Sequence, residues 1–269
     1  RGDIVMIRKA FEFYDACKED RVDAYAAQSA FFIILSALPF LMVMFSLLKY
    51  TFMGKADFLQ LLQSFCPSYV FPFLLTIVDE MYDHSAGILS ITAVAAIWSA
   101  AKGFQYIVKG LNAVYEVDEN RNWFVLRFWA ILYTLIFAFA LLFLLGFMVF
   151  GQTVKNILLK KFAYSTLLSF LGSGVKWLFG IAVLIVFFWV VYTALPNKQL
   201  KMKNQFPGAC FTAGGWTVFS FGLSIYVNDF HGFSMYGSLM TLTLLMLWVY
   251  FCVYIMLLGA ELNAFLTKG

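Results

Sequence analysis

Few side chains in this sequence could bind a charged ligand, and most of them follow or interrupt long apolar segments. Lys102 lies inside the otherwise uncharged start of segment 87–114, and Glu261 lies near the end of the last apolar segment. The predicted binding residues are Lys102, Asn112, Arg121, Arg127, Glu261 and Asn263, with Gln28 and Ser29 at the start of the first apolar segment. An ionisable group at membrane depth is costly and usually faces a partner or a water-filled cavity. We therefore expect a cavity, open to the cytoplasm, that binds an anionic headgroup through Lys and Arg side chains.

The alternative for the same residues is a structural ion-pair network. In that arrangement Glu261 pairs with Lys102 or Arg127 and fixes the last apolar segment to the second or the third. The charges would then hold helices together and bind no ligand. The sequence leaves both interpretations open.

Catalysis and metal binding find little support. The sequence has two histidines, His84 and His231, and its four cysteines are far apart. It has no H-E-x-x-H motif, no P-loop and no Ser–His–Asp order. The cysteine spacing indicates neither a metal site nor a disulfide framework. We therefore expect no enzyme activity, no metal and no cofactor.

Composition indicates a membrane protein. Of the 269 residues, 62% are hydrophobic and 13% are charged, whereas a soluble domain has about 25% charged residues. The net charge of +4 is spread over the connections between apolar segments. This distribution favours anionic lipid headgroups as partners and disfavours nucleic acid.

Six apolar segments are long enough to cross a hydrocarbon core of about 30 Å. We predict an all-α integral membrane protein, a single polytopic domain over residues 1–269. The predicted spans are at about 24–50, 87–114, 124–151, 175–195, 208–228 and 238–265.

The segments outside these spans are amphipathic. Residues 1–22 are predicted to form a helix on the membrane surface, although a soluble helix packed on other loops fits the pattern nearly as well. Residues 51–86 and 152–174 are predicted to be outer connections that pack under the interface or dip into the bilayer.

The basic residues predict the orientation. Thirteen of the 19 Lys and Arg residues lie in the amino-terminal flank, the second-to-third and fourth-to-fifth connections, and the tail. The positive-inside rule places these segments, and so both termini, in the cytoplasm. The lysine-rich third-to-fourth connection is the exception, since four basic residues, three in 152–174 and Lys176 just after it, then fall on the outer side.

Small residues and one proline are predicted to shape the helix packing. Pro39 is expected to kink the first span. Small residues permit close backbone contact between membrane helices. They recur on one face of the second span (Ala93, Ala96, Ala100, Gly103) and every seven residues in the fifth (Gly208, Gly215, Gly222).

Six motifs occur in order over nearly the whole chain: SAFFIILSALPF, GILSITAVAAIWSAAKG, LNAVYEVDENR, FPGACFTAGGW, YGSLMTLTLLMLWVYF and GAELNA. Together they resemble the YihY/virulence factor BrkB family of bacterial inner-membrane proteins. The resemblance implies six transmembrane helices and a bacterial cytoplasmic membrane. Members have often been labelled ribonuclease BN, but metal-dependent hydrolysis of RNA needs a clustered His and carboxylate site that this sequence lacks. The family's association with envelope properties and virulence favours, by analogy, the handling of lipids or envelope precursors.

These observations predict a transporter or flippase-like protein that moves a lipid or another amphipathic anion. An interior groove near Lys102 is where such a ligand would bind. The alternative is a non-transporting scaffold that organises an envelope complex through its small-residue faces. The expected partners are membrane lipids and an amphipathic anionic substrate, and the sequence leaves open an oligomer or a partner protein.

Overall fold

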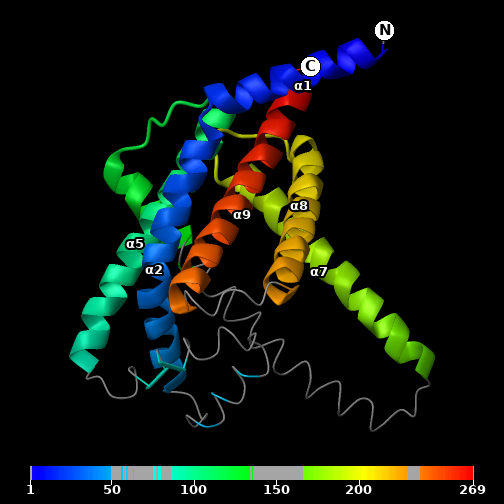
Figure 1. Cartoon of the computed structure of the whole chain (residues 1–269). Helices are drawn as coiled ribbons and strands as arrows, with labels where there is room; N and C mark the ends of the chain where they lie inside the picture. Colours follow the sequence, from blue (N-terminus) through cyan, green and yellow to red (C-terminus); the bar gives the residue numbers. More distant parts are fainter. Residues whose placement is uncertain are drawn as a thin grey trace.

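The computed structural model describes residues 2–49, 86–133, 166–229 and 237–268, together with a few single residues of 51–85 and residue 135. These residues are helical apart from short connections, and no strand occurs among them. The helices are α1 (Gly2–Glu19), α2 (Val22–Lys49), α5 (Ala86–Val114), α7 (Thr166–Ala194), α8 (Met202–Asp229) and α9 (Gly237–Lys268) (Figure 1). A further apolar helix, Trp123–Tyr133, follows α5.

The bounds of α2, α5 and α9 agree with the predicted spans to within three residues. Helix α7 was predicted to start at 175 but begins at Thr166, because its glycines are tolerated in a continuous apolar helix. Helix α8 was predicted to start after Pro207 but begins at Met202. Pro207 removes only the bond to the carbonyl of Lys203, which lies in the exposed first turn. Most of the predicted third span, nearly all of 51–86 and residues 152–165 lie outside the described residues.

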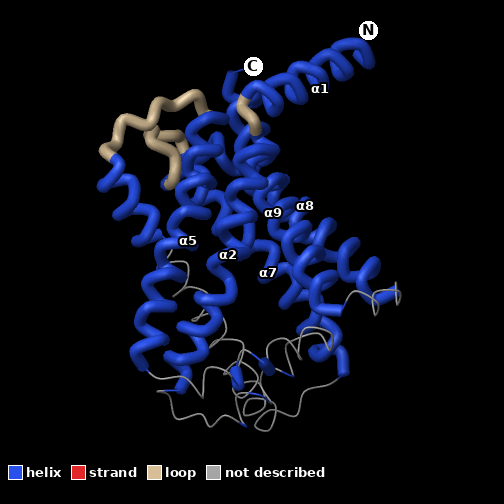
Figure 2. The backbone as a smooth tube through the Cα atoms, turned by 60° about the vertical axis from the view of Figure 1, so that its left-hand side comes forward, coloured by secondary structure: helices blue, strands red, loops and turns tan. Residues whose placement is uncertain are grey.

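Helix α9 is the centre of the bundle. It packs against α2 on one side and α8 on the other, while α2 makes its most extensive contact with α5 and α8 also packs on α7. The buried core therefore combines α2, α5, α7, α8 and α9 and includes Leu111, Phe188, Tyr192 and Leu257. Figure 2 shows α2, α5, α8 and α9 running roughly along one direction, with α1 leaving the bundle at one end.

One end of the bundle collects both termini and two connections. The loops after α5 and after α7 lie at the end where α1 begins its turn into α2 and where α9 finishes (Figures 1 and 2). We call it the polar end. Helix α5 stops here in a Schellman turn, in which the amides of Glu116 and Val117 bond the carbonyls of Ala113 and Asn112. Glu116 occupies the left-handed position of this turn, with φ 49°.

Helix α1 has one packed face and one exposed apolar face. Phe13 meets Phe265 of α9 edge to face at 5.9 Å between ring centroids, and Cys17 is buried beside it. Ile7, Phe11 and Tyr14 are all more than half exposed. The predicted amphipathic helix is therefore present, docked on the end of α9 with its predicted apolar stripe uncovered.

Apolar side chains also cover the outside of the bundle. Val218, Leu178 and Val94 are each about 70% exposed on α8, α7 and α5. Helical stretches Met202–Val227 and Leu242–Thr267 are long and apolar enough to cross a membrane, as judged over the described residues. Contiguous exposed apolar surface of this kind is rare on soluble monomers.

Candidate functional site

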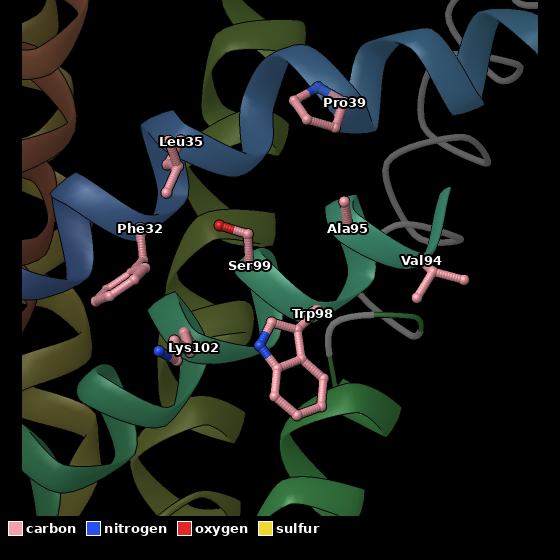
Figure 3. A pocket seen from close by; sticks show the side chains of 8 residues that line it. All are labelled: Phe32, Leu35, Pro39, Val94, Ala95, Trp98, Ser99 and Lys102. Carbon is pink, nitrogen blue, oxygen red and sulfur yellow. The ribbon is translucent and has the colours of Figure 1, made fainter. Parts of the chain in front are cut away.

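A groove with a volume of about 840 Å³ runs between α2 and α5 (Figure 3). Ligand sites typically enclose roughly 300–1,000 Å³. Its lining comprises Phe32, Leu35 and Pro39 from α2 and Val94, Ala95, Trp98, Ser99 and Lys102 from α5. Among these lining residues Lys102 alone is charged, so the groove is an apolar channel with a single cation.

Lys102 approaches an aromatic ring and pairs with no carboxylate of the described residues. Its Nζ lies 5.1 Å from the centroid of the Phe32 ring, and no carboxylate in the described part of the chain pairs with it. The residue stands twelve positions before the end of α5, roughly 18 Å from the polar end along the helix axis. A lysine in an apolar groove without a carboxylate partner among the described residues favours an anionic ligand.

Arg127 fixes the wall of the groove from outside. Its guanidinium stacks 3.9 Å from the centroid of the Trp98 ring, and Nη2 donates a hydrogen bond of 2.7 Å to the Trp98 carbonyl. The side chain is only 5% exposed, and its buried Nε finds no hydrogen-bond acceptor among the described residues. Arg127 therefore orients the indole and adds a second positive charge behind it.

Ser99 supplies a hydroxyl within the groove. It precedes Lys102 by three residues, so both side chains lie on one face of α5. Figure 3 shows the hydroxyl pointing toward α2 and Lys102 reaching toward Phe32. The Ser99 Oγ is buried and has no hydrogen-bond partner in the described structure. It is therefore a polar atom of the groove wall whose hydrogen bond is not made in the described structure.

A second polar group joins the two loops of the polar end. Asn112 Nδ2 donates to Glu119 (2.7 Å), and Asn112 Oδ1 accepts the backbone N–H of Asn197 (2.9 Å). Arg121 forms a two-pronged pair with Glu119, with both bonds at 2.7 Å. The hydrogen bonds from Arg121 lower the pKa of the Glu119 carboxyl, and the same pair raises the pKa of Arg121. In this loop latch the charges of Glu119 and Arg121 pair with each other, and none of its residues lines the α2–α5 groove.

A third polar group ties the end of α9 to the start of α8. Asn263 is fully buried; its Oδ1 accepts the N–H of Gly208 (2.7 Å) and its Nδ2 donates to the Gln205 carbonyl (3.2 Å). The Tyr115 hydroxyl donates to Gln205 Oε1 at 2.5 Å. Burial raises the pKa of Tyr115 above its ordinary value. Both polar ends of Asn263 are thus used inside the bundle.

Glu261 belongs to this third region. Its side chain is 2% exposed on α9. Burial, together with the charges of Glu261 and Asp20, raises the pKa of Cys17 to about 12. Glu261 therefore lies close enough to α1 to act on Cys17, whereas the ring contacts of Lys102 and Arg127 are with Phe32 and Trp98.

The structure therefore divides the predicted cluster into three places. Lys102 and Asn112 are ten residues apart on α5, roughly 15 Å along its axis, and cannot share one small ligand. Arg127 lies beside the groove of Lys102, against Trp98. Arg121 and Asn112 both bond Glu119. Glu261 and Asn263 lie on α9, near its contacts with α1 and α8. Sequence reasoning estimated depth in the membrane but not the face of the helix on which each residue lies.

The remaining predicted residues lie at helix contacts or on the surface. Gln28 is exposed, and Ser29 is buried with its hydroxyl bonded to the Tyr25 carbonyl at 2.7 Å. A Cβ at Gly103 would lie 3.0 Å from Ile33 of α2, so these helices touch closely there. Ala100 is partly buried on α5, and the side chains of Ala93 and Ala96 lie outside what the structure describes.

The glycines of α8 differ from one another. A Cβ at Gly208 would collide with the Gly259 carbonyl of α9, and one at Gly215 would lie 2.8 Å from Ile255. A Cβ at Gly222 would meet no described atom within 4 Å. Among the described atoms, close packing on α9 therefore involves Gly208 and Gly215 but not Gly222.

Sequence reasoning missed a buried junction of three helices. The Tyr192 hydroxyl of α7 is bonded to Thr212 Oγ1 of α8 (2.6 Å) and donates to the Met256 carbonyl of α9 (2.7 Å). Tyr192 is fully buried. A tyrosine near the end of an apolar helix reads as an interface anchor, so the sequence gives no signal that this hydroxyl is used inside the bundle.

No group of three or more His, Cys, Asp and Glu side chains capable of holding a metal ion occurs among the described residues. The α2–α5 groove presents a cation and a hydroxyl in an apolar surrounding.

Comparisons with known proteins agree on the kind of protein. A family model described as "Virulence factor BrkB" matches residues 13–269. The ribonuclease-like protein YfkH of Bacillus subtilis is 32% identical over 245 residues, which cover 90% of this chain and 89% of YfkH. A UPF0761 membrane protein of Alteromonas mediterranea is 27% identical over 96% of this chain and 87% of its own. One from Vibrio parahaemolyticus is 26% identical, with 93% and 79% covered. No solved structure matches.

Proposed function

The chain belongs to the virulence factor BrkB family of membrane proteins, and we propose that it is a transporter or flippase-like protein for an amphipathic anion, with the α2–α5 groove as its binding site. The observation that carries this proposal is Lys102, a cation deep in an apolar groove without a carboxylate partner among the described residues. The groove lies at the surface of the bundle, where Leu35 and Val94 are exposed, so a lipid can enter sideways from the bilayer.

The proposal includes the predicted membrane arrangement. Six spans and cytoplasmic termini would put the polar end, with Lys109, Lys198, Lys201 and Lys203 exposed on it, in the cytoplasm. For a bacterial member of this family the membrane would be the inner membrane. The groove would then connect a cytoplasmic polar surface with the interior of the bilayer.

Ribonuclease activity is not part of the proposal. The name of YfkH is ribonuclease-like, but the groove offers one cation and one hydroxyl, and neither can activate water for RNA cleavage without a metal or a base. A binding and transport role uses the residues that are present.

The test is lipid translocation in reconstituted liposomes. Purified protein in vesicles of phosphatidylcholine with fluorescent phosphatidylglycerol should expose the inner-leaflet label to a membrane-impermeant quencher faster than empty vesicles do. Lys102→Gln should slow this exchange, whereas Lys109→Gln should not. Lys109 is a matched control because it lies on the same helix, 5.4 Å from the Tyr106 ring, and outside the groove. Protein-containing vesicles that behave as empty ones, with this lipid and with lipid-linked envelope precursors, would contradict the proposal.

A second candidate is a membrane scaffold, favoured by the outer face of α8. Gly214 and Gly222 meet no described neighbour within 4 Å, and Val218 between them is 72% exposed. Gly214 and Gly222 are eight residues apart, about two helical turns, and small residues exposed on a helix suit contact with another helix. Replacement of Gly214 and Gly222 by Leu should abolish co-purification of a stoichiometric partner if this role is correct, and should leave translocation unchanged.

A further inference from the structure

The groove has a direction as well as a charge. Along α5 it runs from Val94 to Lys102, eight residues or roughly 12 Å. Lys102 and Ser99 lie nearer the polar end of the bundle, and Val94 and Ala95 lie farther from it. On α2, Pro39 lies on the far side and Phe32 on the near side (Figure 3). The polar groups are therefore at one end and carbon-only side chains at the other.

The charge available to a ligand is a single one. Lys102 is the only charged side chain among the described lining residues. The guanidinium of Arg127 is stacked behind Trp98 and bonded to its carbonyl, so it adds positive potential without reaching the groove surface. A ligand with two negative charges would bury one of them without a direct partner, which is costly in an apolar site.

The geometry points to an amphiphile with one negative charge, whose headgroup lies at Lys102 and Ser99 and whose acyl chain runs toward Val94 and Pro39. This inference rests on the proposed function and specifies its ligand. Such a molecule has the same orientation as a lipid of the leaflet on the side of the two termini, with its head toward the polar end. The ligand therefore enters the groove from that leaflet.

A substitution at Ser99 distinguishes a role in ligand binding from a role in the stability of the fold. Its Oγ has no hydrogen-bond partner in the described structure, so removal of this hydroxyl costs the ligand-free protein no bond. Ser99→Ala should leave the thermal unfolding temperature of the ligand-free protein unchanged or raised. The same variant should bind the anionic lipid several-fold more weakly, because one hydrogen bond to the charged headgroup is lost.

The experiment measures binding and pose in lipid nanodiscs, without transport as a readout. Fluorescent phosphatidylglycerol, with one headgroup charge, should bind the full-length protein, and zwitterionic phosphatidylcholine should not compete. Lys102→Gln should weaken binding about 10- to 100-fold, Lys102→Arg should retain it, and Lys109→Gln should match the wild type. Two photoreactive phosphatidylglycerols, one reactive in the headgroup and one at the chain end, then report the pose. The chain-end reagent should label around Val94 and the headgroup reagent around Lys102.

Three results would overturn the inference: equal competition by phosphatidylcholine, unchanged binding by Lys102→Gln, or labelling in the reverse sense. The proposed function fails separately. If the lipid binds in the inferred pose but never crosses the membrane, the transport proposal is wrong and the ligand assignment stands. If wild-type protein moves lipid and Lys102→Gln moves it equally well, transport stands and the assignment of the groove falls.

Discussion

Gly208→Ala probes the tightest crossing in the bundle. The added Cβ would collide with the Gly259 carbonyl and with the Asn263 side chain, which accepts the N–H of Gly208. Overpacking of this kind costs about 1–3 kcal/mol, and loss of the hydrogen bond adds about 1 kcal/mol. We therefore expect the free energy of unfolding to fall by about 2–4 kcal/mol. Equilibrium unfolding of the purified protein by titration with SDS, followed by circular dichroism, measures this change.

Gly222→Ala is the matched control on the same helix. An added Cβ at Gly222 meets no described atom within 4 Å, and Ala in a helix interior is favoured over Gly by roughly 0.5–1 kcal/mol. This variant should unfold like the wild type or slightly later. Equal losses in the two variants, or no loss in Gly208→Ala, would show that α8 and α9 do not cross at Gly208 and Gly259.

Three further outcomes follow. Tyr192→Phe removes the hydroxyl that is bonded to Thr212 Oγ1 and to the Met256 carbonyl. It should therefore lower the free energy of unfolding by about 1–3 kcal/mol. If the variant unfolds at the same SDS concentration as the wild type, the three-helix junction is wrong. Arg121 lowers the pKa of Glu119 in the folded protein, so this pair stabilises above the unfolded pKa of about 4.3 and its contribution disappears as pH falls through the lower folded value. Glu119→Gln should therefore reduce stability at pH 7, and its difference from the wild type should shrink as the pH is lowered below about 4, as unfolding at a series of pH values will show. The pKa of Cys17 is raised to about 12, so only about one thiol in 10,000 is ionised at pH 8. A variant with Cys17 as its only cysteine should therefore react slowly with maleimide until SDS unfolds the protein. Rapid labelling before SDS is added would show that α1 is not docked on α9.

The helices that could be predicted from sequence are those with long uncharged segments. In α2, α5 and α9 the apolar length alone sets the bounds, because the hydrocarbon thickness requires it. The predicted start of α8 was wrong because Pro207 was taken as the helix boundary. A proline near the start of a helix removes only a backbone hydrogen bond in the exposed first turn. The start of α7 was wrong because Gly172 and Gly174 were taken as part of a connection.

The candidate site was predicted in part. Lys102 and Gly103 were identified because a charged residue and a residue without a side chain are conspicuous in an apolar helix. The partners of Lys102 could not be predicted, since they depend on which face of α2 meets α5. Phe32 reads as an ordinary member of an apolar span, Pro39 as a kink in it, and Trp98 as a membrane anchor. In the loop latch Asn112 bonds Asn197, 85 positions later in the chain, and no local pattern indicates that contact.

A density map of the protein in nanodiscs that contain phosphatidylglycerol tests the central claim most directly. An antibody fragment bound at the polar end would provide the mass needed for electron cryo-microscopy. We predict elongated density in the α2–α5 groove, with its headgroup end within about 4 Å of the Lys102 Nζ, the distance of an ion pair, and with that density absent from Lys102→Gln. A groove that is empty in the wild type, or equally occupied in the variant, would contradict the account.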